Sequence, residues 1–279
     1  MKLLRVGEKG REIPAILDSN NKIRSLENHI EDFDSKNLNF ETINKIKKIN
    51  LASLQEINEP IRIGPCIKNP GKFIAIGLNY SDHAEESGMA IPKEPIIFQK
   101  ASSSIIGPND HVILPAGSKK LDWEIELAFV IGKETKNITE AQAPDHIFGY
   151  CIANDISERE WQLEMGGNWT KGKSGDTFGP IGPYLVTKDE IPNINNLSLN
   201  LKLNGKVMQK GNTDKMIFNV FFILSYLSKF MSLQAGDIVT TGTPPGVGMG
   251  MKPQVFLKKG DVMNLAIDCL GEQKQEVIQ

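Results

Sequence analysis

The stretch Asp122-Trp123-Glu124-Ile125-Glu126-Leu127-Ala128-Phe129-Val130-Ile131 decides how this chain folds. Successive side chains of a β-strand point to opposite faces. In a strand over residues 123–131, one face would hold Trp123, Ile125, Leu127, Phe129 and Ile131, and the other would hold Glu124, Glu126, Ala128 and Val130. Because both faces are apolar from residue 128 onward, the pattern predicts a strand that runs inside the protein.

Glu124 and Glu126 would then lie together at the end of a buried face. Burying unpaired carboxylates is costly, and two like charges in one place raise the cost. A hard divalent cation compensates both charges, since Mg²⁺ and Mn²⁺ prefer oxygen ligands. Pairing with lysine or arginine, or an exposed strand face, would explain the same residues. The Glu-x-Glu pattern alone leaves these interpretations open.

A second acidic side chain follows the apolar segment at residues 150–155, which ends in Asn154-Asp155. A carboxylate at the end of a strand is well placed to line a site. It is equally able to cap the helix that we predict over residues 157–165. Ser157 competes for the capping role, so the sequence leaves both roles open for Asp155.

His83 has the most suggestive setting of the four histidines. A buried strand ends at Gly77, and a polar segment then begins a short helix. Residues three apart are neighbours on a helix, so His83 and Glu86 would lie side by side. A carboxylate beside an imidazole orients it and raises its basicity, which suits a general base that activates water. An ordinary charge pair on an exposed helix is the alternative.

The remaining pattern is that of a β-rich α+β protein with two parts. We predict strands at residues 3–6, 14–17, 73–76, 96–99, 112–114, 123–131, 150–155, 183–187, 199–203, 237–241 and 262–267, and helices at 25–33, 40–49, 157–165 and 216–230. Asn204-Gly205 predicts a tight hairpin. Proline and glycine at 59–72 indicate a linker, which divides the chain into a small N-terminal domain, 1–65, and a larger domain, 66–279.

Composition narrows the class of protein. The 279 residues carry a net charge of -2, with 40% hydrophobic and 24% charged residues, as in ordinary globular proteins. A nucleic-acid partner is not expected at this charge. No apolar run approaches the roughly 20 residues that cross a bilayer. The three cysteines, Cys66, Cys151 and Cys269, form no metal or disulfide signature, so we expect a cytoplasmic protein.

Several of these segments together resemble the fumarylacetoacetate hydrolase family. The resemblance extends from about residue 72 to 273 and rests on the order of four pieces. These are Gly77-Leu78-Asn79-Tyr80 with Asp82-His83, then Glu124-Ile125-Glu126-Leu127, then Asn154-Asp155 with Arg159, and finally Thr241-Gly242-Thr243-Pro244. The resemblance implies a mixed β-roll catalytic domain and a homodimer.

The resemblance also implies roles for individual residues. Glu124, Glu126 and Asp155 would bind Mg²⁺ or Mn²⁺. Lys173 would lie beside the metal and the substrate, although Lys171 is close in sequence. The substrate would contact Arg159, Gln162 and Thr243, and a water-activating dyad would consist of His83 and Glu86.

The activity implied is hydrolysis of the C–C bond of a 2,4-diketo acid, either an acylpyruvate or a diketo-deoxy-sugar acid. In such a reaction a metal-stabilised enolate forms on the pyruvate fragment. Members with the same metal chemistry include oxaloacetate decarboxylases and isomerases of 2-oxo-diene-dioates. Residues 155–162, with Gly172-Lys173 and residues 176–180, are similar to bacterial ureidoglycolate lyases or diketo-deoxy-sugar-acid hydrolases, so ureidoglycolate cleavage is the principal alternative activity.

Overall fold

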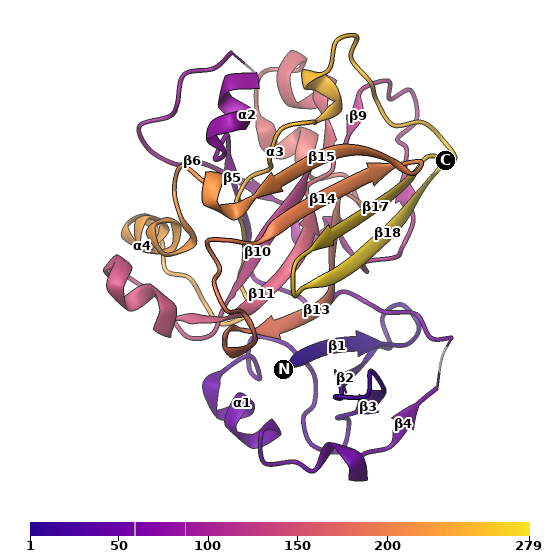
Figure 1. Ribbon diagram of the computed structural model, residues 1–279, viewed down its shortest axis with the longest axis vertical. Helices are drawn as coiled ribbons and strands as arrows, with labels where there is room; N and C mark the ends of the chain where they lie inside the picture. The colour runs from indigo at the N-terminus through magenta and orange to yellow at the C-terminus, as the bar shows by residue number, and fades with distance from the viewer. Residues whose placement is uncertain (59, 87) are drawn as a thin grey trace.

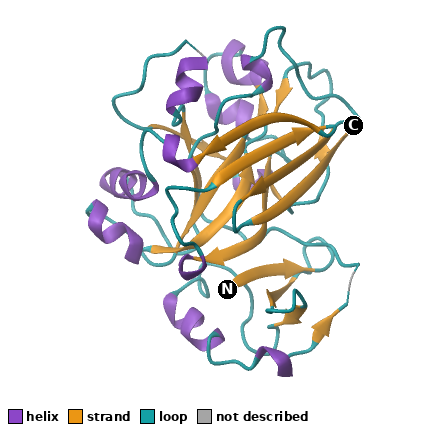
Figure 2. Ribbon diagram, viewed as in Figure 1, coloured by secondary structure: helices purple, strands orange, loops and turns teal. Residues whose placement is uncertain are grey.

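The computed structural model of the protein describes residues 1–58, 60–86 and 88–279 (Figure 1). Its described strands form one large mixed sheet, a smaller five-stranded sheet and a two-stranded sheet, with few helices around them (Figure 2). In the described residues, no helix is both long and apolar enough to span a membrane.

The centre of the large sheet is built from the segments that carry the acids. β10 (Ile125–Ile131) pairs antiparallel with β11 (Ile147–Asn154), and β11 pairs antiparallel with β13 (Gly179–Thr187). On its other side β10 pairs with β16 (Ile238–Thr240), which runs parallel to β5 (Phe73–Gly77). β6 (Ile96–Lys100) pairs with β5 at the edge, and the short β7 (Ile105–Ile106) pairs with β13.

The smaller sheet covers one face of β10. Its strand order is β15 (Lys206–Asn212), β14 (Ser198–Leu203), β17 (Val262–Ile267), β18 (Gly271–Ile278) and β8 (Val112–Ile113). The hairpin between β14 and β15 turns at Asn204 and Gly205, which have φ of 50° and 82°, so this prediction is confirmed.

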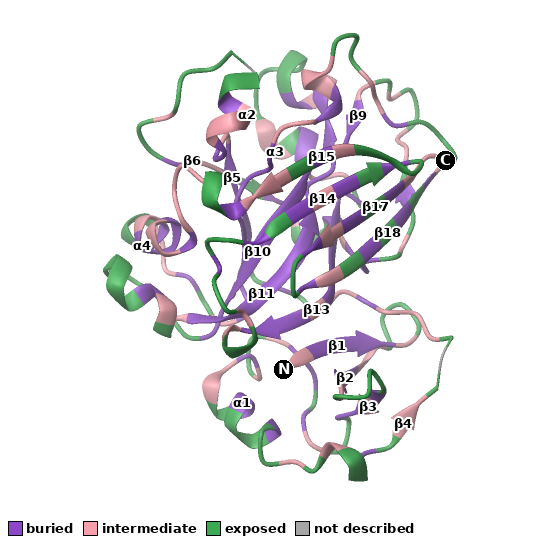
Figure 3. Ribbon diagram, viewed as in Figure 1, coloured by how far each residue is buried: buried purple, intermediate pink, exposed green. Residues whose placement is uncertain are grey.

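Both faces of β10 are buried, as its sequence predicts (Figure 3). Ile125, Leu127 and Phe129 belong to the hydrophobic core shared with β14 and β17. Ala128 and Val130 belong to a second core that includes N-terminal residues such as Leu3. The central strand therefore joins two cores, and its acidic end is held rigidly by both.

The N-terminal strands extend the large sheet. β1 (Lys2–Val6) pairs with β13, with Leu3 opposite Leu185. Beyond β1 follow β2 (Ile13–Leu17), β3 (Ile23–Ser25) and β4 (Glu56–Ile57), and α1 (Phe40–Ile46) lies beside them. The division at residue 65 stays a prediction, and the strands on its two sides share one sheet.

Two helix predictions are wrong. Residues 25–33 form strand end, turn and loop, because side chains such as Asp32, which accepts the Phe33 N–H at 2.8 Å, satisfy the backbone locally. Residues 157–165 begin as β12 (Ser157–Glu158), which pairs with β9 (Leu121–Asp122), and continue as a single π-helical turn, Glu160–Glu164.

The long C-terminal helix is confirmed with a later start. α4 (Val220–Phe230) begins after Asn219, whose side chain accepts the N–H groups of Phe221 and Phe222. This is N-capping by asparagine, which ends the preceding extended segment. The short helices α2 (Ser81–Glu86) and α3 (Trp169–Lys173) lie at the same end of the large sheet, where β5 and β6 meet them (Figure 1).

Candidate active site and metal centre

The three predicted metal ligands lie together at one end of the central strand pair. Glu124 immediately precedes β10, Glu126 lies on it, and Asp155 immediately follows β11. The Asp155 N–H donates to the Glu124 carbonyl at 2.9 Å, which fixes the two segments to each other. Each residue offers a carboxylate oxygen, all three are buried, and these oxygens lie within 4.8 Å of one another.

Two cations hold Glu124. Lys173 Nζ lies 2.7 Å from Glu124 Oε2 and 2.7 Å from Asp155 Oδ2, so it bridges the two acids. Arg159 Nη2 donates to Glu124 Oε1 at 2.7 Å. Burial opposes ionisation of Glu124, but Lys173 and Arg159 outweigh burial and lower its pKa to about 2. Glu124 is therefore a carboxylate at neutral pH.

Within residues 1–58, 60–86 and 88–279, Glu126 is the one of the three acids that forms no ion pair. Among the described residues, the hydrogen bond to its carboxylate comes from the Gly242 N–H, at 2.9 Å. Burial, followed by the charges of Asp155 and Glu124, raises its pKa well above the usual value. Three hard oxygen donors with unbalanced negative charge fit a divalent cation such as Mg²⁺ or Mn²⁺, and these residues would hold it.

Lys100 is a buried residue of this cluster that the sequence did not reveal. Its Nζ donates to Asp155 Oδ1 at 2.5 Å, and its side chain is fully buried. One signal was present: on a strand over 96–100, Lys100 shares a face with Phe98, and a lysine on an apolar face needs an acidic partner.

A cavity of about 540 Å³ opens beside the acids. Eight of the nine predicted site residues line it, namely His83, Glu86, Glu124, Glu126, Arg159, Gln162, Lys173 and Thr243. Lys171 is exposed and donates to the Met165 carbonyl, so Lys173 is the lysine beside the acids. The structure thus brings together residues that are up to 160 positions apart.

The predicted substrate contacts are partly engaged within the protein. Arg159 Nη1 donates to Gln162 Oε1 at 3.0 Å, which leaves the Gln162 amide nitrogen as the end that can donate elsewhere. The Thr243 hydroxyl donates to the Ile125 carbonyl at 2.9 Å and accepts from Gln209 at 2.8 Å. These bonds fix Gln162 and Thr243 in the cavity wall.

His83 and Glu86 face each other on α2. His83 Nδ1 lies 3.3 Å from Glu86 Oε2, so the other ring nitrogen, Nε2, is the one directed away from the carboxylate. The helix is anchored by Asn79, whose amide donates to the Thr241 and Phe218 carbonyls at 2.8 and 3.0 Å. This anchor ties α2 to the loop that carries Gly242 and to the start of α4.

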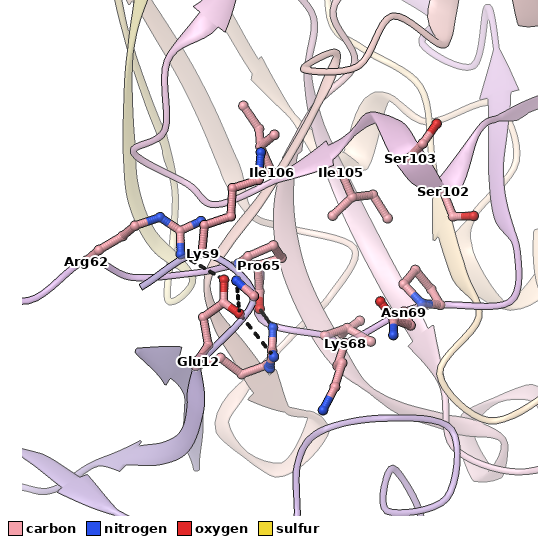
Figure 4. Close-up of a pocket in the computed structure, with 14 residues that line it drawn as sticks. Lys9, Glu12, Arg62, Pro65, Lys68, Asn69, Ser102, Ser103, Ile105 and Ile106 are labelled. Carbon is pink, nitrogen blue, oxygen red and sulfur yellow. Dashed lines mark hydrogen bonds and ion pairs between the residues drawn. The ribbon is translucent and has the colours of Figure 1, made fainter. Parts of the chain in front are cut away.

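A second cavity, of about 550 Å³, lies between the N-terminal strands and residues 102–106 (Figure 4). Its charged side chains Arg5, Glu12 and Arg62 are already paired. Arg62 contacts Glu12 at 2.8 Å and Asp110 at 2.6 Å, and Arg5 contacts Asp32 at 2.6 Å. None of the three clustered acids lines this cavity, and its ion pairs connect the N-terminal strands to the rest of the protein.

Comparison with known proteins identifies the class. Residues 72–278 match the family model described as fumarylacetoacetate (FAA) hydrolase C-terminal. The match covers most of the chain, which therefore belongs to the fumarylacetoacetate hydrolase family. A protein of Burkholderia ambifaria named as a hydrolase is 54% identical over 276 residues, covering 99% of this chain and 98% of that protein.

Two solved structures share the fold over the whole chain. The fumarylacetoacetate hydrolase of Exiguobacterium antarcticum has a TM-score of 0.90 and 33% identity, covering 100% of this chain and 99% of that one. The maleylpyruvate hydrolase of Sphingobium sp. SYK-6, solved with manganese(II) and pyruvate, has a TM-score of 0.84 and 27% identity, with coverage of 100% and 99%. These comparisons confirm the predicted family, the β-rich fold and the prediction that the protein is an enzyme of the hydrolase or isomerase type.

Proposed function

We propose that the protein is a divalent-metal-dependent hydrolase that cleaves the C–C bond of a 2,4-diketo acid. The observation that carries the proposal is that Glu126, which forms no ion pair among the described residues, lines the same cavity as the His83–Glu86 pair. A cation site and a general base within the same cavity are the two elements that such a hydrolysis needs.

The metal and the product class have support from a relative. The maleylpyruvate hydrolase of Sphingobium sp. SYK-6 was solved with manganese(II) and pyruvate. Pyruvate is also the fragment that an acylpyruvate would release here. Glu124, Glu126 and Asp155 would hold Mg²⁺ or Mn²⁺, which supplies Lewis-acid stabilisation of the 2-oxo acid and of its developing enolate charge.

The residues around the acids orient the substrate. Arg159 is fixed by Asp122, which accepts from its Nε at 2.9 Å, and by Glu124. In this orientation Arg159 holds Gln162, whose amide nitrogen donates to the substrate carboxylate. Lys173 stays charged between Glu124 and Asp155 and offsets the negative charge that gathers on the pyruvate fragment.

His83 acts as the general base. Its Nε2 takes a proton from water, and the water oxygen bonds to the C4 carbonyl carbon of the substrate. The C3–C4 bond then breaks, its electron pair stays on the pyruvate fragment as an enolate, and protonation of C3 gives pyruvate and a second acid. Glu86 stabilises the imidazolium, because its carboxylate lies 3.3 Å from Nδ1.

The cavity walls favour an acylpyruvate over a sugar acid. Apolar side chains line the cavity beyond the acids, among them Leu78, Phe98 and Trp169. Met89 and Leu163 also line it and are 52% and 46% exposed. Such walls match an apolar acyl tail, and Glu85 and Lys252 are further polar residues of the lining.

We also infer that the enzyme is a homodimer, as the family resemblance implies, and that it is cytoplasmic, as the pattern of its cysteines indicates. Sedimentation equilibrium of the native protein tests the dimer, and a monomer at micromolar concentration would contradict it.

A pyruvate-release assay tests the proposed activity. The panel holds acylpyruvates with tails of increasing length, a diketo-deoxy-sugar acid and oxaloacetate, with Mg²⁺ or Mn²⁺ and then with EDTA. We expect EDTA-sensitive pyruvate release, fastest with an acylpyruvate. Release of glyoxylate and urea from ureidoglycolate, with no pyruvate from any panel member, would instead identify a lyase.

A further inference from the structure

Lys100 is a buried cation at the end of β6. It is not among the described residues that line the cavity. Its Nζ donates to Asp155 Oδ1 at 2.5 Å, to the Ile156 carbonyl at 3.3 Å and to the Lys173 carbonyl. An ammonium group has three protons, and each has an acceptor here. Lys100 therefore acts through the groups that it holds rather than by contact with substrate.

The two oxygens of Asp155 have different partners. Oδ1 is held by Lys100, whereas Oδ2 accepts from Lys173 at 2.7 Å, the same ammonium that reaches Glu124 Oε2. Oδ2 is thus the oxygen on the side of Glu124. An aspartate can bind a cation through one oxygen or through both. Oδ1 is held by an ammonium that is not among the cavity-lining residues, whereas Lys173, the partner of Oδ2, lines the cavity, so Oδ2 is the oxygen directed toward the other acids.

The same lysine also fixes α3. Lys100 holds the carbonyl of Lys173, the last residue of that helix, and the next N–H along the chain, that of Ala101, donates to Ser174 Oγ at 2.9 Å. Trp169, at the start of α3, packs edge-on against Phe98 of β6 with ring centroids 5.3 Å apart. The position of Lys173 and the orientation of Asp155 therefore depend on one side chain.

We propose that Lys100 is a positioning residue that keeps Asp155 monodentate, so that the cation retains an open position beside a chelated substrate and attracts that substrate more strongly. This inference rests on the proposed metal site. Mg²⁺ takes about six ligands, so three monodentate acids leave about three positions, and a chelating 2-oxo acid needs two of them. If Asp155 bound through both oxygens, about two positions would remain, the chelate would fill both, and the added carboxylate oxygen would weaken the attraction of the cation for an anionic chelate.

The test compares wild type with Lys100→Met, both loaded with Mn²⁺. Water-proton relaxation counts exchangeable waters on Mn²⁺, and calorimetry gives the affinities for Mn²⁺ and for oxalate, a chelating probe. We expect Lys100→Met to lose about one water and to bind oxalate roughly tenfold more weakly. Its Mn²⁺ affinity is expected to equal or exceed that of wild type, because a neighbouring positive charge is removed.

Wild-type relaxation and oxalate affinity in Lys100→Met would overturn the inference, as would loss of Mn²⁺ binding. If Lys100→Met does not fold, Lys100→Gln is measured in the same way and is expected to lose the same water. Absence of Mn²⁺ binding by wild type would instead contradict the proposed function, so the two failures are distinguishable.

Two matched variants separate positioning from a general loss of stability. Lys72→Met also removes a lysine from a buried acid, since Lys72 Nζ lies 2.9 Å from Asp237 Oδ2, remote from the three clustered acids. It is expected to lower the unfolding temperature and to leave relaxation and oxalate affinity unchanged. Ser174→Ala removes the adjacent tether alone and is expected to retain the wild-type number of waters.

Discussion

The N–H of Gly246 lies 3.1 Å from Glu86 Oε2, the same oxygen that contacts His83 Nδ1. A loop that follows β16 therefore holds the carboxylate of a helix formed some 160 residues earlier in the chain. The bond fixes the rotamer of Glu86 and with it the ring of His83. General bases need such fixed geometry, because proton transfer requires hydrogen-bond distance.

Removing the imidazole should separate catalysis from metal binding. His83→Ala is expected to lower turnover of the best acylpyruvate by about 10²–10⁴-fold, since the general base is lost. Its Mn²⁺ affinity, measured by calorimetry, should equal that of wild type because His83 belongs to α2 and not to the acidic cluster. Unchanged turnover would remove the dyad from the mechanism.

The two adjacent glutamates of α2 should behave differently. Glu86→Gln is expected to lower turnover strongly, because the carboxylate that faces His83 loses its charge. Glu85→Gln should retain most of the activity, since Glu85 is two residues from His83 and the spacing of neighbours on a helix is three or four. Equal losses in the two variants would argue against the assignment of the dyad.

Gly246 has no room for a side chain. Its φ is 103°, and an added Cβ would collide with the Met208 carbonyl oxygen, whereas Gly260, with φ of 88°, has open space around the same position. Gly260→Ala should cost about 1 kcal/mol of unfolding free energy from backbone strain. Gly246→Ala should cost more and should also lower turnover, and equal denaturation midpoints for the two variants would contradict this account.

Loss of one proposed metal ligand, Glu124, should be measurable as a lower metal affinity in the absence of substrate. Glu124→Ala is expected to weaken Mn²⁺ binding by more than about 100-fold, because it removes a proposed direct ligand. Loss of a residue that only hydrogen-bonds to a ligand typically lowers metal affinity by about 10–100-fold. Calorimetry on the EDTA-treated protein measures this effect. Glu164→Ala, at an exposed acid, provides the control, and full Mn²⁺ occupancy in Glu124→Ala would refute the ligand assignment.

The raised pKa of Glu126 predicts how stability depends on pH in EDTA. The unfolded chain releases this proton near the ordinary pKa, while the folded protein retains it to higher pH. Folding therefore binds a proton in that window, and the unfolding free energy falls as pH rises, by at most about 1.4 kcal/mol per pH unit. Glu126→Gln should remove this slope between pH 5 and 8 in urea titrations, and saturating Mn²⁺ should reduce it.

Most strands were predictable because their patterns are local. The alternation in residues 123–131 and the apolar run at 150–155 give β10 and β11, and those strands position the acids. The helix expected at 157–165 failed because Ser157 pairs with Asp122 and Glu158 with Leu121, contacts across 35 and 37 residues that no local pattern encodes.

The residues of the candidate site also divide into those with a local sequence signal, which were predicted, and those that depend on distant contacts, which were missed. Glu124 and Glu126 stand out because two acids interrupt an apolar strand. Lys100 was missed because its meaning depends on Asp155, which lies 55 residues further along the chain. Likewise, the sequence does not reveal that Gly242 supplies the hydrogen bond of Glu126, since that contact spans 116 residues.

The pairing of β1 with β13 has a practical consequence for anyone who shortens this protein. A chain that starts at residue 66 would leave one edge of β13 without its neighbour and would uncover the apolar surface around Leu185 that Leu3 and Ile16 help to bury. Unpaired edges of this kind recruit other strands and cause aggregation. The family-matched segment is therefore expected to be recovered as insoluble material, although it contains every residue of the candidate site.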